Sequence, residues 1–142
     1  MKLINALASA IVLTLSFASL NVAAADTAKK HNVVFQITDS DPVKLNQAMN
    51  SATGMQKNVG KDKINIEVVA TGPGLDMLKL ESPVGDRMSE AVKNGIVFVA
   101  CGATMKAMKV TEKDLLPGVI VVPGGLIEIM TKQEAGWTYL KI

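Results

Sequence analysis

Short apolar, β-branched segments alternate with helix-forming segments along most of this chain, and only short turns join them. Each segment of the first kind has the length and residue types of a buried strand. Strands and helices that alternate in this way pack as helices on both faces of a parallel sheet. The pattern therefore predicts an α/β fold, a three-layer sandwich around a five-stranded, mainly parallel sheet. The expected strands cover residues 32–38, 64–70, 96–101, 119–122 and 137–142.

The segment after the first expected strand carries the signals of an amphipathic helix. Asp41 suits the N-cap, Pro42 suits the first helical position, and Gly60 suits the stop. Thr111 and Asp114 fit a capping box of one further turn. The apolar residues at the spacing of one buried helix face are Leu45, Ala48, Met49, Ala52 and Met55. Further helices are expected over residues 75–80, 84–94, 102–109 and 126–135.

General rules of parallel sheets predict the order of the strands. Right-handed crossovers and the common flavodoxin-like arrangement give the order 2-1-3-4-5, in which the first and third strands are neighbours. The second strand alternates apolar residues with Asn65 and Glu67, which indicates a place at or near a sheet edge. The third strand is apolar throughout and is expected at the centre. Ligands bind at the carboxyl ends of such strands, where Asp39 and Cys101 lie.

Residues 1–25 have the composition of a targeting segment rather than of the domain. Lys2 is their only charged residue, and a run of alanines ending at Ala25 provides the small residues that a signal peptidase requires. A cleaved signal peptide is predicted, which places the protein in the periplasm or outside the cell; an uncleaved membrane anchor is the alternative. Residues 26–31 are then a flexible lead-in, and residues 32–142 a single domain without membrane association.

Charge and residue usage exclude several classes of function. The net charge is +2, with basic and acidic residues interspersed, which argues against a nucleic-acid surface. The one histidine, His31, precedes the first strand and thus lies opposite Cys101, which disfavours a Cys-His hydrolase and a histidine-rich metal site. We expect no metal and no cofactor; a weaker alternative is Cu(I) held by Cys101, Met105 and Met108.

Cys101 is the only cysteine, so that no intrachain disulfide can form. It ends an expected strand and precedes a helix, where backbone N–H groups and the helix dipole stabilise a thiolate. Lys106, one turn further on, adds positive potential. The alternative is that Cys101 is a small buried residue that only packs.

Glycine-rich turns are expected to border Cys101. The segments 72–74 and 123–125 close the second and fourth strands on the same rim. Their glycines allow a ligand close to the backbone, and their N–H groups could bind an anion, although tight turns without a ligand need the same residues. The candidate binding residues at this rim are Asp39, Gly72, Gly74, Gly102, Thr104 and Gly124.

Several sequence blocks occur together in one order: DPVKLN at 41–46, VATGPG at 69–74, FVACGATM at 98–105, DLLPG at 114–118, VVPGG at 121–125 and EAGWTYL at 134–140. Together they resemble the DsrE/DsrF-like family of small sulfur-metabolism proteins. The resemblance implies a flavodoxin-like α/β fold and assembly into homo-oligomers, trimers or hexamers. In the sulfur-relay members a cysteine carries a persulfide, and Cys101 falls on its position.

The residues and the resemblance together leave two functions open. The first is a periplasmic DsrE/DsrF-like protein that handles sulfane sulfur through a persulfide on Cys101, as a sulfurtransferase or a sulfur carrier. Its partners would be a sulfur donor or an acceptor thiol. The second is a non-catalytic, oligomeric module that binds a small ligand or a partner at the glycine-lined rim, with Cys101 only packing.

Overall fold

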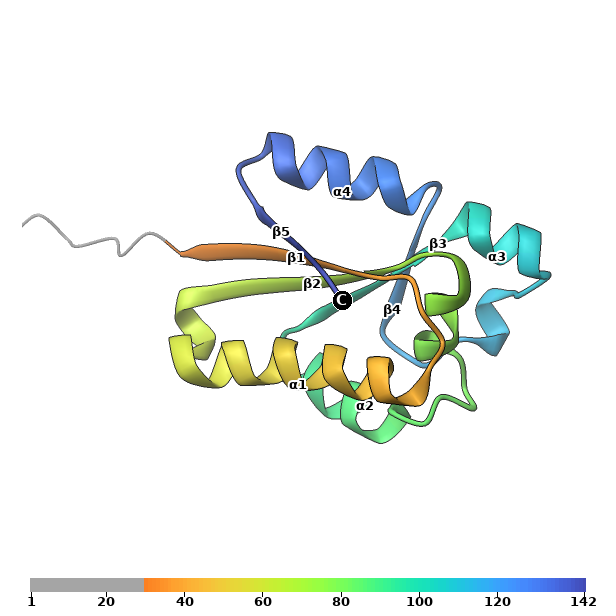
Figure 1. The fold of residues 1–142 in the computed structure, drawn as a ribbon, viewed down its shortest axis with the longest axis horizontal. Helices are drawn as coiled ribbons and strands as arrows, with labels where there is room; N and C mark the ends of the chain where they lie inside the picture. The colour runs from red at the N-terminus through yellow and green to blue at the C-terminus, as the bar shows by residue number, and fades with distance from the viewer. Residues whose placement is uncertain (1–29) are drawn as a thin grey trace, which may run out of the picture.

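The computed structural model describes residues 30–142, which form one sheet of five strands flanked by helices (Figure 1). Every neighbouring pair of strands is parallel, which confirms the predicted α/β class. The strands are β1 (His31–Ile37), β2 (Ile64–Ala70), β3 (Val97–Cys101), β4 (Val119–Val122) and β5 (Thr138–Lys141). The predicted signal peptide and most of the predicted lead-in lie outside the described residues, and β1 already begins at His31.

Helical segments connect the strands, and most lie where the sequence predicts them. They are α1 (Pro42–Val59), η1 (Lys61–Lys63), η2 (Gly72–Leu78), α2 (Gly85–Lys93), α3 (Gly102–Met108), η3 (Glu112–Asp114) and α4 (Gly125–Glu134). The predicted start of α1 is confirmed, because Asp41 accepts a hydrogen bond from the Val43 N–H at 2.8 Å. The capping box of Thr111 and Asp114 is present on η3. Within residues 30–142, no helix is both long enough and apolar enough to span a membrane.

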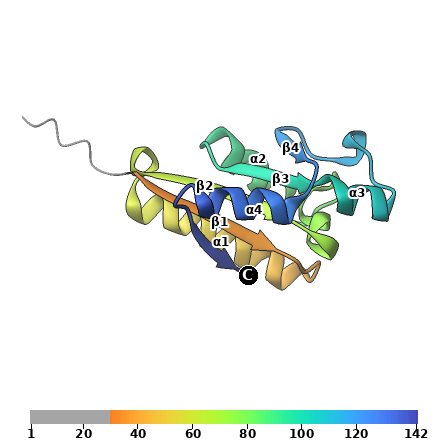
Figure 2. The ribbon, with the colours of Figure 1, turned by 90° about the horizontal axis from the view of Figure 1, so that it is seen from above.

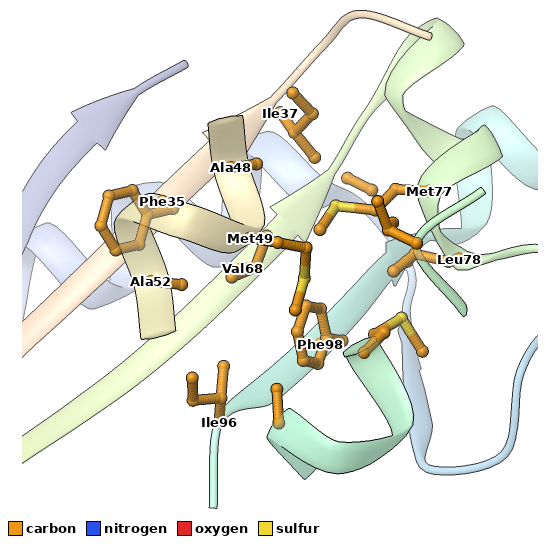
Figure 3. Packing of buried hydrophobic residues seen from close by; sticks show 14 of the residues in the cluster. Phe35, Ile37, Ala48, Met49, Ala52, Val68, Met77, Leu78, Ile96 and Phe98 are labelled. Carbon is orange, nitrogen blue, oxygen red and sulfur yellow. The ribbon is translucent and has the colours of Figure 1, made fainter. Parts of the chain in front are cut away.

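The helices form two layers around the sheet. Figures 1 and 2 show α1 and α2 on one face and α4 on the other. The larger core lies under α1, α2 and η2, where side chains such as Phe35, Met49 and Phe98 interlock (Figure 3). A smaller cluster of Val34, Val69, Val99 and Ile129 lies under α4. The predicted three-layer sandwich is thus confirmed, with one face covered by a single helix.

The predicted strand order 2-1-3-4-5 is wrong, since the observed order is β4-β3-β2-β1-β5. The chain steps from β1 through β2 and β3 to β4 in one direction and then returns across the sheet to place β5 beside β1. A right-handed crossover in the reverse direction must run over the opposite face. This explains why α4 alone covers that face and why β1 and β3 are not neighbours.

β2 is the middle strand, so its predicted place near an edge is also wrong. Glu67 is only 3% exposed, and its carboxylate is paired with Lys132 of α4 at 2.5 Å. Asn65 donates a hydrogen bond to the Asn32 side chain of β1 at 2.8 Å. Polar residues in this strand therefore indicate partners on neighbouring elements rather than contact with water. The strand expected at the centre, β3, lies beside the edge strand β4.

Candidate functional site

A cleft of about 590 Å³ lies where β3 and β4 end. The two strands lead into helices that diverge, because Met105 of α3 packs into the larger core whereas α4 crosses the other face. Ligands of parallel sheets bind where neighbouring strands send their connections to opposite sides. The cleft is lined by Gln36, Thr71 and Cys101 from the strand ends, by Ala103, Thr104 and Ala107 from α3, and by residues 124–127 at the start of α4.

Cys101 is the last residue of β3 and the N-cap of α3. Alternation along the strand directs its side chain to the α4 face, the same face as Val99. The side chain is 6% exposed, and its Sγ accepts a hydrogen bond from the Gly125 N–H at 3.1 Å. The cysteine is thus both buried and part of the cleft surface, with a donor already directed at its sulfur.

The surroundings of Cys101 favour its thiolate form. Burial raises the pKa of the thiol, but hydrogen bonds from the Thr104 hydroxyl and from the N–H groups of Gly125, Thr104 and Ala103 outweigh it and bring the pKa below 9.0. Thr104 Oγ1 itself accepts the Gly72 N–H at 3.0 Å, which leaves the hydroxyl proton for the sulfur. A thiolate, rather than a thiol, is the nucleophile in sulfur chemistry.

Replacing Thr104 with valine is expected to raise the pKa of the Cys101 thiol, because the valine side chain offers no hydroxyl that could stabilise the thiolate. Because the group is an acid with a lowered pKa, alkylation by iodoacetamide falls as pH decreases through that pKa, and the variant's midpoint moves to higher pH. The measurement is the pH profile of the alkylation rate. Thr104→Ser keeps the hydroxyl and is expected to retain the wild-type midpoint; a shared shift in both variants would contradict this role.

Gly125 brings α4 into contact with the sheet beside Cys101. A Cβ at this position would lie 2.6 Å from Thr71 Cγ2 and 3.0 Å from Cys101 Cβ, which is too close for any side chain. The missing side chain therefore lets the Gly125 N–H reach the sulfur. The sequence prediction chose Gly124 of this pair, which lines the cleft, and missed Gly125 as the residue that contacts Cys101.

A buried polar network that the sequence prediction missed adjoins Cys101. Gln36 donates a hydrogen bond to Thr71 Oγ1 at 3.1 Å and accepts one from the Tyr139 hydroxyl at 2.6 Å. Gln36 and Thr71 are less than a tenth exposed, and both line the cleft. The available signal was Gln36 itself, a polar residue between Phe35 and Ile37, in the part of the strand from Val33 onward that is buried and otherwise apolar.

The other candidate residues divide into two groups. Thr104 and Gly124 line the cleft, and the Gly72 N–H supports Thr104. Three others serve the backbone nearby: Asp39 accepts the Asp41 N–H at 2.9 Å, Gly74 packs against the Ile37 carbonyl, and Gly102 packs against the Val122 carbonyl. The glycine amides expected to bind an anion are partly used within the protein, because the Gly74 N–H is donated to the Thr71 carbonyl at 3.2 Å.

The sulfur atoms considered for Cu(I) do not share one surface. Met105 packs into the larger core, Met108 is 40% exposed, and Cys101 faces α4. Among the described residues, no three of the histidine, cysteine, aspartate and glutamate side chains are grouped so that they could hold a metal ion. Lys106 is exposed on α3 outside the cleft, and His31 begins β1 at the opposite end of the sheet.

Comparisons with known proteins agree on the fold. The family model described as DsrE/DsrF-like family matches residues 16–142. A protein of unknown function from Methanobacterium thermoautotrophicum, MTH1491, shares 30% identity with a TM-score of 0.76, over 80% of this chain and 100% of its own. BT1422 from Bacteroides thetaiotaomicron has 17% sequence identity and a TM-score of 0.62, and the match covers 78% of this chain and 94% of BT1422. The ychN protein from E. coli has 12% sequence identity and a TM-score of 0.63, and the match covers 80% of this chain and 99% of ychN. A search of curated proteins finds no match.

Proposed function

Because this chain belongs to the DsrE/DsrF-like family, we propose that it handles sulfane sulfur by carrying it as a persulfide on Cys101. The observation that carries the proposal is the hydrogen bond that the Gly125 N–H donates to Sγ at 3.1 Å, at a sulfur that lines a cleft. A cysteine that only packs has no need of donors directed at its sulfur, since a thiol is a weak acceptor.

The proposed chemistry is two transfers of one sulfur atom. In the first, the Cys101 thiolate attacks the outer sulfur of a hydropersulfide R–S–SH. A new S–S bond forms at Sγ, the old one breaks, and its electron pair leaves with R–S⁻ while the proton stays on the transferred sulfur. In the second, an acceptor thiolate attacks that sulfur and Cys101 leaves as the thiolate. Neither step requires an external oxidant or reductant.

The surroundings of Cys101 support a carrier role in both steps. Hydrogen bonds that stabilise the thiolate maintain the nucleophile in the first transfer and stabilise the leaving group in the second. The chain has no second cysteine that could attack the persulfide and release the sulfur as sulfide. The cargo is thus retained until an acceptor from another molecule enters the cleft.

Intact-mass measurement tests the proposal. Wild-type protein incubated with a hydropersulfide is expected to gain about 32 Da, the mass of one sulfur atom, and to lose it on addition of a thiol. Cys101→Ser should gain nothing. Absence of the added mass on the wild type, together with a Cys101 that iodoacetamide labels only after denaturation, would overturn the proposal in favour of a binding module.

Two further properties belong to the proposal. Export to the periplasm is supported by the signal-like residues 1–25 and is tested by N-terminal sequencing of the protein recovered from the periplasmic fraction. Homo-oligomers, trimers or hexamers, are supported by the edge strand β4, where Ile120 is 51% and Val121 37% exposed. Light scattering on the purified protein measures the mass; a monomer at micromolar concentration would contradict assembly.

A further inference from the structure

The cleft beside Cys101 has no charged side chain in its lining. Ala103 and Ala107 contribute from α3, Leu126 and Ile127 from α4, and the remaining lining residues are glycines or uncharged polar residues. Leu126 and Ile127 are 67% and 63% exposed, so their side chains are available to whatever enters. A volume of about 590 Å³ falls within the roughly 300–1,000 Å³ that small-molecule sites occupy.

The amide and hydroxyl side chains of the cleft are already hydrogen-bonded within the protein. Gln36 is bonded to Thr71 and Tyr139, and Thr104 accepts the Gly72 N–H. The Gly125 N–H points at Sγ. The Gly125 N–H, which is directed at the sulfur, stabilises one negative charge, that of the Cys101 thiolate. A second anion in the same cleft would lie near that charge without a cation among the lining residues to offset it.

We infer that the cleft takes sulfur donors whose organic group is apolar and uncharged, of the class of aryl and alkyl hydropersulfides, in preference to donors with an anionic substituent. This inference rests on the proposed persulfide function and adds the substrate class. The apolar group packs against Leu126 and Ile127 while its terminal –S–SH reaches Cys101. The transfer is the balanced displacement given above, in which R–S⁻ leaves the cleft and the proton stays on the transferred sulfur.

A matched pair of donors tests the substrate class: benzyl hydropersulfide and 4-carboxybenzyl hydropersulfide. Both carry the same –CH₂–S–SH group, so that the protonation of the reacting sulfur is equal and only the remote carboxylate differs. The rate of persulfide formation on Cys101, followed by intact mass, is expected to be on the order of tenfold higher with the uncharged donor. Equal rates, or a faster reaction with the carboxylate, would overturn the inference while leaving the proposed function intact.

A positive charge introduced at the cleft provides a second test of the substrate class. Leu126→Lys is expected to speed transfer from the carboxylated donor several-fold and thus to reduce the ratio between the two donors. Val43→Lys adds the same charge at a 73% exposed position on α1, outside the cleft, and should leave the ratio unchanged. An equal change of the ratio in both variants would contradict binding at Leu126. If neither donor adds sulfur to wild-type Cys101, the proposed function itself fails, and the inference with it.

Discussion

Replacing Gly125 with alanine is expected to lower the free energy of unfolding by about 1–3 kcal/mol and to slow alkylation of Cys101. The added methyl group would stand 2.6 Å from Thr71 Cγ2 and 3.0 Å from Cys101 Cβ, inside van der Waals contact. The start of α4 must then move away from the sheet, which lengthens the 3.1 Å bond from the Gly125 N–H to Sγ. With that donor displaced, the pKa of the thiol rises and less thiolate is present at neutral pH.

The neighbouring glycine supplies a matched control. In Gly124→Ala the new Cβ meets only the Ile127 side chain, at 3.3 Å, which can rotate away. This variant is expected to stay within roughly 0.5 kcal/mol of the wild type and to retain the alkylation profile. Urea unfolding gives the stability, and the pH dependence of iodoacetamide labelling gives the pKa. Equal losses in the two variants would contradict the close contact at Gly125.

Replacing Lys132 with methionine is expected to destabilise the protein by about 3 kcal/mol at neutral pH. Lys132 pairs with Glu67, whose side chain is 4% exposed, at 2.5 Å, and its ammonium also lies 4.4 Å from the centre of the Trp137 ring. Glu128 lies 3.4 Å away, on the same side of α4. Without Lys132, the Glu67 carboxylate would be buried beneath α4 with no opposite charge. Chemical denaturation at pH 7.5 measures the loss.

The loss of stability in Lys132→Met is expected to become smaller as pH falls. Burial raises the pKa of Glu67 above its ordinary 4.5; the hydrogen bond and charge of Lys132 oppose this and Glu128 adds to it. Removing Lys132 raises the pKa further. A raised pKa means that the folded state binds the proton of Glu67 more tightly than the unfolded state does. The destabilisation by the buried carboxylate is therefore complete above the folded-state pKa and disappears as pH falls toward the ordinary value of 4.5. A pH-independent loss would contradict this assignment.

The double variant Glu67→Leu with Lys132→Met separates charge from packing. Two apolar side chains of similar size leave no buried charge, and such replacements are often neutral or stabilising. The double variant is therefore expected to recover most of the stability that Lys132→Met loses, with no dependence on pH between 4.5 and 7.5. A double variant as unstable as the single one would show that the contacts of Lys132, rather than its charge, hold α4 in place.

Local features of this fold could be predicted from the sequence because their causes are local. The start of α1 depends on Asp41 and Pro42 and its end on Gly60, and each of these residues lies in the chain at the helix end that it sets. The strand order could not be predicted in the same way. Alternating strands and helices require right-handed crossovers, but they do not say at which step the chain reverses, and here it reverses only before β5. The place of β2 in the sheet was predicted wrongly for a related reason: Glu67 suggested a strand in contact with water, whereas its partner Lys132 lies 65 residues away in the chain.

The position of Cys101 in the site could be predicted from the sequence, but the residues around it could be predicted only in part. A cysteine between a strand and a helix has a defined place at the carboxyl end of a parallel sheet, whatever the strand order. The donor to the Cys101 sulfur, Gly125, lies 24 residues further along the chain, and its close approach to Cys101 and Thr71 is set by how α4 crosses the sheet. A pair of adjacent glycines does not reveal which one faces the sheet. The network of Gln36, Thr71 and Tyr139 likewise joins residues as far as 103 positions apart.

The first residue of helix α4, Gly125, contacts Cys101, and Lys132 lies in the last turn of the same helix. The ammonium group of Lys132 lies over the ring of Trp137, the only tryptophan of the sequence. Trp137 therefore serves as a built-in optical probe of how this helix lies on the sheet. Indole emission depends on a nearby charge and on contact with water, and no other tryptophan contributes to the signal. Displacement of α4 in Gly125→Ala and loss of the charge in Lys132→Met can both be followed by fluorescence on unlabelled protein.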